Sequence, residues 1–373
     1  MKLLLAHPHL DMLGGSERMT SILVSELLEM GHEVGLVTAS MEESWFPRRD
    51  EIKLYWIDRI QLLGDELADR LISDYKALKK AIDEFKPDAS LVVIQETAYA
   101  ALMKMTPHPL KTAVYVHFPY DEEISDVNLN EYIQRYRFPM LADKLVHCVD
   151  LLFCNSKLTQ RAIKQHWKRN AVVVYPRISR FFIENKPEPD GERENTVIYI
   201  ARTVPLKRQK ELIRWFRSIR RKIPDARLVL AGYTDPRHSY YFDELRGELD
   251  QPDGVEFLGT VSGQKLLELY RTAKVYVHPR VGEHFGMAPI EAMSQGCPVI
   301  VRYPAGLCEV MRHRQTGYIA RNDEQLVKYI EKTLTLPEKE WRRLSRNSIR
   351  FAARFSPRRF TTQIVKNLKK LTH

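Results

Sequence analysis

Residues 275–293 carry the sequence VYVHPRVGEHFGMAPIEAM, and this stretch decides the fold class. The apolar run 275–278 predicts a buried strand, the glycine-containing residues 279–286 predict a loop, and the residues after them predict a helix. A strand that leads through a short loop into a helix is half of a βαβ unit, in which a helix joins two parallel strands. The stretch therefore predicts a parallel sheet covered by helices.

The same alternation of strand and helix extends in both directions along the chain of 373 residues, a length that suits about two domains. We predict strands at residues 3–6, 34–38, 91–94, 113–116, 151–154 and 172–175, and again at 197–201, 228–231, 255–258, 275–278 and 299–301. Between the two series, residues 184–195 are almost free of apolar side chains and predict a linker. The sequence thus predicts an α/β fold with two Rossmann-like domains, residues 1–183 and residues 196–355.

Two glutamates in the opening stretch predict a ligand site. Glu283 lies on the loop, and Glu291 comes eight residues later, about two turns inside the helix. Carboxylates accept hydrogen bonds from ribose and sugar hydroxyls, and the N–H groups of residues 285–287 face outward at the positive end of the helix. An anion site flanked by carboxylates is what a sugar joined through a diphosphate to a nucleoside requires.

Two further strand-to-helix turns carry residues that suit a negatively charged ligand. Gly14-Gly15 opens the first helix, where the lack of side chains lets a phosphate or a sugar hydroxyl approach the backbone. Arg202 and Lys207 flank the first turn of the second half, at the carboxyl end of a strand, where two cations can clamp a diphosphate. The alternatives are an ordinary tight turn for the glycines and solvent-exposed side chains for the two cations.

Several function classes lack their motifs here. The chain contains no GxGxxG, GxxxxGK[ST] or GxSxG sequence, which argues against a dinucleotide oxidoreductase, a P-loop nucleotidase and an α/β-hydrolase. No two aspartates lie two residues apart, so we expect no DxD metal site. The four cysteines show neither CxxC nor zinc spacing, no apolar run reaches the roughly 18 residues of a membrane span, and the first residues do not resemble a signal peptide. We therefore expect a cytoplasmic protein.

The net charge of +10 is concentrated at the C-terminal end. Residues 341–373 contain seven Arg, three Lys and no acid, which suits an anionic lipid surface or nucleic acid, or simply two solvated helix faces. Residues 129–145 add an aromatic and basic stretch that favours a helix lying on anionic lipid, with a core-packing helix as the alternative. Because the chain has no aromatic RNA-binding or zinc motif and its surplus charge is confined to one end, we expect no nucleic-acid partner.

Residues 283–298, with Glu283 and Glu291 at E-x7-E spacing, resemble the signature of the retaining glycosyltransferases of family 4, which have the two-domain GT-B fold. The resemblance covers nearly the whole chain. Similar to the family are the glycine loop at residues 13–18, the Arg/Lys clamp, the loop around Val261 that would bind the base, and the turn at residues 304–306, where Ala305 replaces a glycine. The resemblance implies a central cleft and a last helix, residues 357–371, that returns to the first domain.

The resemblance also implies roles for single residues. Arg202 and Lys207 would stabilise charge on the leaving diphosphate, Glu291 would bind the ribose, and Glu283 would lie near the donor sugar. His117 would contact a sugar hydroxyl, although on its residues alone it could equally be a buried, hydrogen-bonded loop histidine. Further donor contacts are implied for Gly14, Gly15, Val261, His284, Phe285, Gly286 and Met287. The donor would be GDP- or UDP-linked, and transfer would proceed with retention, without a metal ion and without a cofactor.

Four short motifs resemble more narrowly the mannosyltransferases of the dolichol-linked oligosaccharide pathway: Val116-His117-Phe118-Pro119, Cys154-Asn155-Ser156, Val173-Val174-Tyr175-Pro176 and Glu283-His284-Phe285-Gly286. With the basic C-terminal end, they favour transfer of a mannose-like or glucose-like hexose to a polyprenyl-linked or polysaccharide acceptor by an enzyme peripheral to the cytoplasmic membrane face. Two alternatives stay open. One is a soluble glycosyltransferase with a small sugar or metabolite acceptor, and the other is a nucleotide-sugar epimerase of the same fold.

Overall fold

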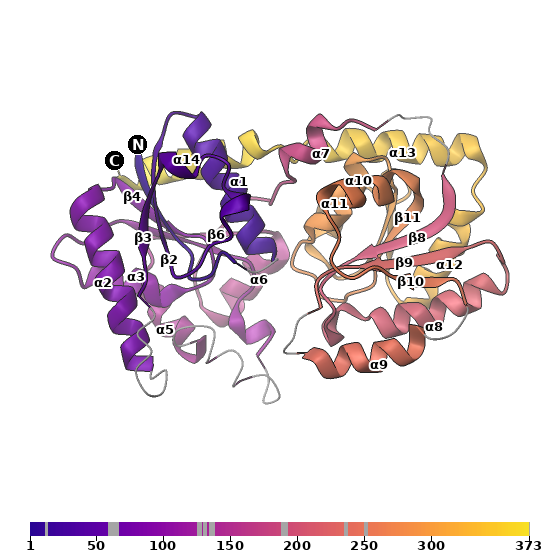
Figure 1. Ribbon diagram of the computed structural model, residues 1–373, viewed down its shortest axis with the longest axis horizontal. Coiled ribbons are helices and arrows are strands. Elements are labelled where there is room, and N and C mark those ends of the chain that lie inside the picture. The colour runs from indigo at the N-terminus through magenta and orange to yellow at the C-terminus, as the bar shows by residue number, and fades with distance from the viewer. Residues whose placement is uncertain are drawn as a thin grey trace. The chain divides into compact units, whose positions relative to one another are not determined.

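The structure is a computed structural model that describes residues 1–11, 14–58, 67–124, 129, 133, 139–187, 193–234, 238–249 and 253–372. Residues 130–132 and 134–138 of the aromatic and basic stretch 129–145, and residues 188–192 of the expected linker, lie outside the described residues. The chain forms two compact units. One unit comprises Met1–Arg177 together with Pro357–His373, and the other comprises Ile178–Ser356 (Figure 1).

The first unit is built on a seven-stranded sheet with the order β3-β2-β1-β4-β5-β6-β7, in which every pairing is parallel. Its strands are β1 (Lys2–Ala6), β2 (Glu33–Thr38), β3 (Ile52–Trp56), β4 (Ala89–Val92), β5 (Thr112–Val116), β6 (Leu151–Cys154) and β7 (Val172–Val173). Its helices are α1 (Gly15–Glu29), α2 (Leu67–Phe85), α3 (Thr97–Lys104), α5 (Ala142–Leu145), α6 (Lys157–His166) and α14 (Pro357–Thr372).

Alternate residues of β1 explain how this sheet is covered on both faces. Leu3 and Leu5 belong to one apolar cluster, with side chains from α1 and α14. Leu4 and Ala6 belong to the other, with side chains from α2 and α3. Because successive side chains of a strand point to opposite faces, a continuous apolar strand such as β1 requires helices on both sides. Figure 1 shows α14 beside α1 in this unit.

The second unit repeats this architecture with a six-stranded parallel sheet in the order β10-β9-β8-β11-β12-β13. Its strands are β8 (Glu194–Ile200), β9 (Arg227–Ala231), β10 (Val255–Phe257), β11 (Ala273–His278), β12 (Val299–Arg302) and β13 (Gly317–Ala320). Its helices are α7 (Arg180–Glu184), α8 (Gln209–Arg220), α9 (Ser239–Leu249), α10 (Gly263–Thr272), α11 (Met287–Ser294), α12 (Asp323–Leu334) and α13 (Glu338–Ala352). The α/β class expected from the sequence is confirmed.

The division between the units differs from the expected boundary at residues 184–195. It falls after Arg177, because the short helix α7 packs within the second unit. The ring of Phe182 lies 5.7 Å from that of Tyr270, and the Gln295 side-chain amide donates a hydrogen bond of 2.6 Å to the Phe182 carbonyl. At the other end, α14 belongs to the first unit, where Phe360 and Ile364 are buried in its core.

Candidate functional site

The predicted site residues of the second unit gather at the carboxyl edge of its sheet. Strands β8 and β11 are neighbours, so the segments that follow them, residues 201–207 and 279–286, meet at that edge. The loop after β12 joins them through the backbone. The Gly282 N–H donates to the Pro304 carbonyl over 2.7 Å, and the Gly306 N–H donates to the Glu283 carbonyl over 2.8 Å.

Glu283 is the centre of a buried charged cluster. Its carboxylate oxygen Oε2 accepts a hydrogen bond from Lys207 Nζ at 2.5 Å and one from His278 Nε2 at 3.0 Å. Arg280 Nη1 lies 3.7 Å from the same oxygen. Glu283 itself is only 9% exposed. Charged groups so far from water are stable only when they are paired, and this pairing joins the clamp residue and the loop glutamate into one arrangement.

The electrostatics of the cluster decide its protonation. Burial alone would raise the pKa of the Glu283 carboxyl, but Lys207, Arg280 and His278 outweigh it and hold that pKa well below its ordinary value. Burial lowers the pKa of the Lys207 ammonium, with Arg280 and Arg202 acting in the same direction and Glu283 opposing them. Burial also lowers the pKa of His278, so its ring is neutral at pH 7. Two cations then face one carboxylate, which leaves a surplus positive charge for an anionic ligand.

Arg202 follows β8 and precedes the short 3-10 turn Pro205–Lys207. Its carbonyl accepts a hydrogen bond of 2.7 Å from the Gln209 side-chain amide, which ties this turn to the start of α8. The charge of Arg202 is near enough to oppose that of Lys207. The two cations of the predicted clamp therefore lie within electrostatic reach of each other.

Glu291 lies on α11, which begins at Met287 with Gly286 as its N-cap residue. It is the fifth residue of that helix, just over one turn inside it, so the expected depth of two turns was wrong. The Glu291 carboxylate is 1% exposed, and the Tyr270 hydroxyl donates to its Oε2 over 3.4 Å. Glu291 is therefore a buried residue of the second unit and not a surface residue.

The other residues of this unit that were predicted to contact the donor include buried residues and a loop residue. Phe285 is buried against Phe355, with ring centres 5.9 Å apart, and His284 is buried too. Val261 lies on the loop before α10, whose N-cap Ser262 accepts a hydrogen bond from the Lys265 N–H. The Phe285 side chain therefore packs in the core, and only its backbone remains a candidate for ligand contact.

The predicted residues of the first unit lie at the carboxyl ends of its strands. Gly14 is the N-cap residue of α1, with extended backbone, and Gly15 is the first residue of that helix. His117 directly follows β5, is half-buried, and shares a hydrogen bond of 3.2 Å between its Nε2 and the Val93 carbonyl. The Asn155 side chain donates to the His117 carbonyl over 2.7 Å. His117 thus combines a fixed ring with a position at the edge where ligands of parallel sheets bind.

Comparison with known proteins identifies the family of this chain. The family model for Glycosyl transferases group 1 matches residues 181–351, and the model for Glycosyltransferase Family 4 matches residues 13–179. The chain belongs to the family 4 glycosyltransferases. The enzyme therefore transfers a sugar from a nucleotide sugar, and the epimerase alternative is set aside.

Similar proteins span most of the glycosyltransferase. A Dictyostelium discoideum protein named GDP-Man:Man(3)GlcNAc(2)-PP-Dol alpha-1,2-mannosyltransferase is 24% identical over 86% of this chain and 70% of its own. The Mus musculus alpha-1,3/1,6-mannosyltransferase ALG2 is 23% identical over 99% of this chain and 96% of its own. The crystal structure of Anabaena HepE in complex with UDP and glucose superposes with a TM-score of 0.79, at 17% identity over 99% of this chain and all of that one. This likeness shows the GT-B fold.

Two residues of the charged cluster were missed in the sequence of the glycosyltransferase. His278 ends β11 and Arg280 follows it by two residues, and both contact the Glu283 carboxylate. Their position in the sequence could have indicated them. Each is adjacent to Pro279, which follows the buried strand β11 at the edge where the site was expected. Both residues lie in the stretch 275–293 that predicted the strand and loop, but no role was assigned to either of them.

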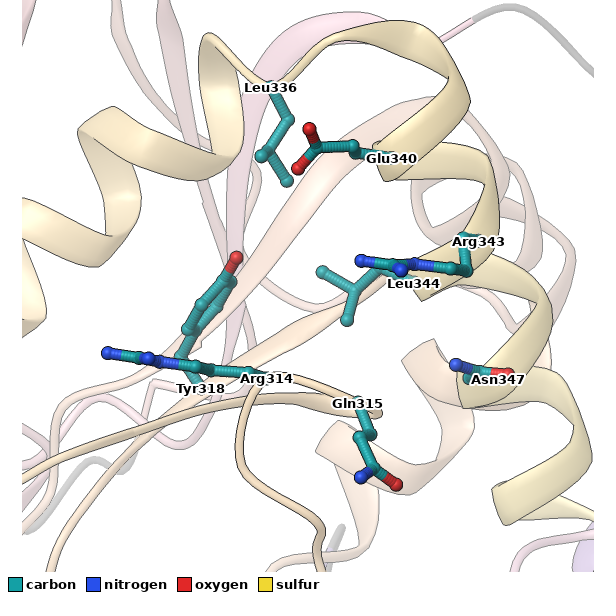
Figure 2. A pocket seen from close by; sticks show the side chains of 8 residues that line it. All are labelled: Arg314, Gln315, Tyr318, Leu336, Glu340, Arg343, Leu344 and Asn347. Atoms are coloured by element: carbon teal, nitrogen blue, oxygen red, sulfur yellow. The ribbon is translucent and has the colours of Figure 1, made fainter.

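A surface pocket of the glycosyltransferase lies elsewhere. It is lined by Arg314, Gln315, Tyr318, Leu336, Glu340, Arg343, Leu344 and Asn347 (Figure 2). These residues come from the start of β13, the loop before it, the segment between α12 and α13, and α13 itself. The start of a parallel strand is at the opposite edge of the sheet from its carboxyl end, so this pocket is not part of the charged cluster.

Proposed function

We propose that the enzyme transfers mannose from a GDP-linked donor to a lipid-linked glycan, with retention at the anomeric carbon and without a metal ion. The observation that carries this proposal is the buried contact between Lys207 and Glu283. It places a cation suited to a diphosphate beside an ionised carboxylate suited to sugar hydroxyls. The choice of mannose and of a lipid-linked acceptor is supported by the names of the two mannosyltransferase relatives.

In this mechanism the bond from the anomeric carbon to the phosphate oxygen breaks, and its electron pair goes to the diphosphate. Lys207 and Arg202 stabilise that charge, which is worth more in a buried site than in water. The acceptor oxygen bonds to the anomeric carbon on the face that the phosphate leaves, and its proton passes to a phosphate oxygen. Glu291 binds the ribose, while His117 contacts a sugar hydroxyl.

A panel of nucleotide sugars tests the donor. GDP-mannose at about 100 times its Kd should add roughly 2.7 kcal/mol to the free energy of unfolding, whereas UDP-glucose at the same concentration should add less. Transfer is then assayed with a polyprenyl-linked glycan and with free mannose, and NMR of the product reports the anomeric configuration. An inverted product, or faster transfer to free mannose than to the lipid-linked glycan, would contradict the proposal.

We also propose that the enzyme docks on an anionic membrane through the exposed face of α14. The apolar side of this helix, including Phe360, Ile364 and Leu368, is buried in the first unit. The opposite side exposes the five cations Arg358, Arg359, Lys366, Lys369 and Lys370. No ion pair joins these five to an acid in the described part of the chain. Each Lys or Arg near an anionic bilayer adds about 1 kcal/mol to binding.

His32 lies near the basic face of α14. The pKa of His32 is lowered by burial and then by the charges of the N-terminal amine, Lys369 and Arg358. These groups therefore lie close to one another on the first unit. The described helices include none that is both long and apolar enough to cross a bilayer.

Vesicle sedimentation tests the docking. The protein should sediment with vesicles that contain about 30 mol% phosphatidylserine and should stay in the supernatant when the vesicles are neutral, and salt should weaken the binding. Exchange of Lys366, Lys369 and Lys370 for Glu should abolish it. The matched control exchanges Lys76, Lys79 and Lys80 of α2 for Glu and should keep it. Equal binding of the two variants, or tighter binding to random DNA than to the vesicles, would contradict the proposal.

A further inference from the structure

The His278 ring of the charged cluster packs with the buried rings of Tyr199 and Tyr276. These three rings form a layer on the neighbouring strands β8 and β11. The ring of His278 stands at 87° to that of Tyr199, with centres 5.7 Å apart, and stacks at 11° on that of Tyr276, with centres 6.4 Å apart. Tyr199 and Tyr276 contact each other edge to face, with centres 6.2 Å apart. Rings that pack in this way have few alternative rotamers, so the polar atoms they carry are fixed in space.

Two of these rings hold residues of the donor site. The Tyr199 hydroxyl donates a hydrogen bond of 2.9 Å to the Lys207 carbonyl, at the end of the 3-10 turn that carries the lysine. His278 Nε2 donates to the Glu283 carboxylate over 3.0 Å. The Tyr276 hydroxyl instead donates to the Ile200 carbonyl of β8, over 3.0 Å. Tyr276 therefore supports the layer without contacting Lys207 or Glu283 through its polar atom.

We propose that His278 and Tyr199 are positioning residues for sugar transfer, since they fix the Glu283 carboxylate and the Lys207 turn in one relative geometry. The proposal rests on the proposed function, because it takes Glu283 and Lys207 to act on the donor. Without the hydrogen bond from His278, Oε2 of Glu283 keeps only its contacts with Lys207 and Arg280, and these two cations alone then set the orientation of the carboxylate. It would then meet the cations rather than the sugar hydroxyls.

The protonation state of the His278 imidazole is consistent with a positioning role. His278 is 3% exposed, and its Nδ1 has no hydrogen-bond partner among the described residues. A second proton would therefore place an unpaired N–H and a positive charge beside Lys207 and Arg280. The groups that face the ring are these two cations, Glu283, and the hydroxyl-bearing rings of Tyr199 and Tyr276. The ring thus serves as a neutral donor to one carboxylate.

The test compares His278→Phe, His278→Gln and Tyr276→Phe with the full-length wild type, using the nucleotide sugar that the wild type turns over best. His278→Phe keeps the ring but loses the donor, and should lower kcat by about 10–100-fold while the Kd for the nucleoside diphosphate changes less than about twofold. His278→Gln restores an N–H donor and should recover most of this loss. Tyr276→Phe removes a buried hydroxyl of the same layer, and should lower the melting temperature without a comparable fall in kcat.

Tyr199→Phe tests the second contact. Loss of the hydrogen bond to the Lys207 carbonyl should weaken binding of the nucleoside diphosphate by about fivefold, the effect of one ordinary hydrogen bond. Wild-type kcat in His278→Phe would overturn the proposal for His278. So would equal kcat losses in His278→Phe, His278→Gln and Tyr276→Phe, because a general loss of packing would then suffice. Unchanged nucleotide affinity in Tyr199→Phe would overturn its half of the proposal.

A measurement that needs no turnover separates this proposal from the proposed function. NMR titration of the histidine rings should find the pKa of His278 below its ordinary value, and Glu283→Gln should lower it further, because the carboxylate supports the protonated ring. If the wild type transfers no sugar but this coupling is present, the proposed function fails while the contact stands. If the ring titrates identically in Glu283→Gln, the positioning proposal fails whatever the activity.

Discussion

Helices α1 and α11 both follow a parallel strand at the carboxyl edge of a sheet, and in both the N-cap residue is a glycine, which makes no side-chain hydrogen bond. The reasons for glycine differ. Gly286 has a φ of 89°, which L side chains rarely adopt, and a Cβ there would have ordinary contacts. Gly14 has an extended backbone, but a Cβ there would lie 2.1 Å from Glu17 Oε2. One sequence pattern therefore has a backbone cause in the second unit and a side-chain cause in the first.

The two units also differ in the chemistry at the carboxyl edges of their sheets, here called the first edge and the second edge after the unit to which each belongs. At the second edge, Lys207, Arg280 and Glu283 are buried together, so its geometry depends on charge. At the first edge, the His117 ring shares a hydrogen bond with the Val93 carbonyl, and the His117 carbonyl accepts a hydrogen bond from the Asn155 side-chain amide. The second edge is therefore held by charged side chains, whereas His117 at the first edge is held by hydrogen bonds to backbone carbonyls.

The largest expected effect is that of Lys207→Ala. Loss of the buried cation should cost about 2–4 kcal/mol of transition-state stabilisation in kcat/KM, comparable to the loss of one oxyanion donor. The matched control is Lys210→Ala, three residues on, which pairs with Glu244 at the surface and should keep kcat/KM. EDTA should leave the activity of the wild type intact. Activity that EDTA abolishes, or near-normal turnover by Lys207→Ala, would refute the metal-free clamp.

The second-largest expected effect distinguishes the roles of Glu291 and Glu283 at the second edge. Glu291→Gln should weaken the free nucleoside diphosphate by about 1.5–3 kcal/mol, the value of a hydrogen bond to a buried charged group. Glu283→Gln should lower kcat but should not weaken the diphosphate, because it removes a negative charge from beside Lys207. Calorimetric titration of both variants with GDP measures the difference. A loss of affinity confined to Glu283→Gln would mean that the two roles are exchanged.

Gly286→Ala is expected to act through the backbone. A φ of 89° should cost an alanine about 1–3 kcal/mol of the free energy of unfolding. The control is Gly247→Ala within α9, where a Cβ meets nothing within 4 Å and should stabilise the helix. Denaturant unfolding of both variants tests the sign. A neutral Gly286→Ala would show that this turn relaxes, and would remove the contrast with Gly14.

The fold was predictable where strands are central and wholly apolar. The pattern of β1 and β11 indicated both sheets, but the edge strands β3 and β13 were missed. In β3, Lys53 and Trp56 are exposed beside buried Ile52 and Tyr55, so the apolar run that indicated the central strands is broken. The Glu283–Glu291 spacing indicated the candidate site, and the ligand contacts of these two residues stay a prediction. Nothing in that spacing could show that His278 and Arg280 share the Glu283 carboxylate, because those contacts depend on rotamers and on the neighbouring strand.

The smallest expected effect is that of Gly14→Ala, and it is the sharpest test of the comparison. The atom that a Cβ would meet is the end of the Glu17 side chain, whose Oε2 accepts a hydrogen bond of 2.7 Å from Ser16. Such a side chain can move, but Glu17 is 1% exposed and has little room, so we expect a loss of about 1 kcal/mol or less in the free energy of unfolding.

A double-mutant cycle with Glu17→Ala isolates the cause. In the Glu17→Ala background the second substitution should cost almost nothing, and the coupling energy should equal the single-mutant loss. If Gly14→Ala costs the same in both backgrounds, the Glu17 carboxylate is not the reason for glycine at this position.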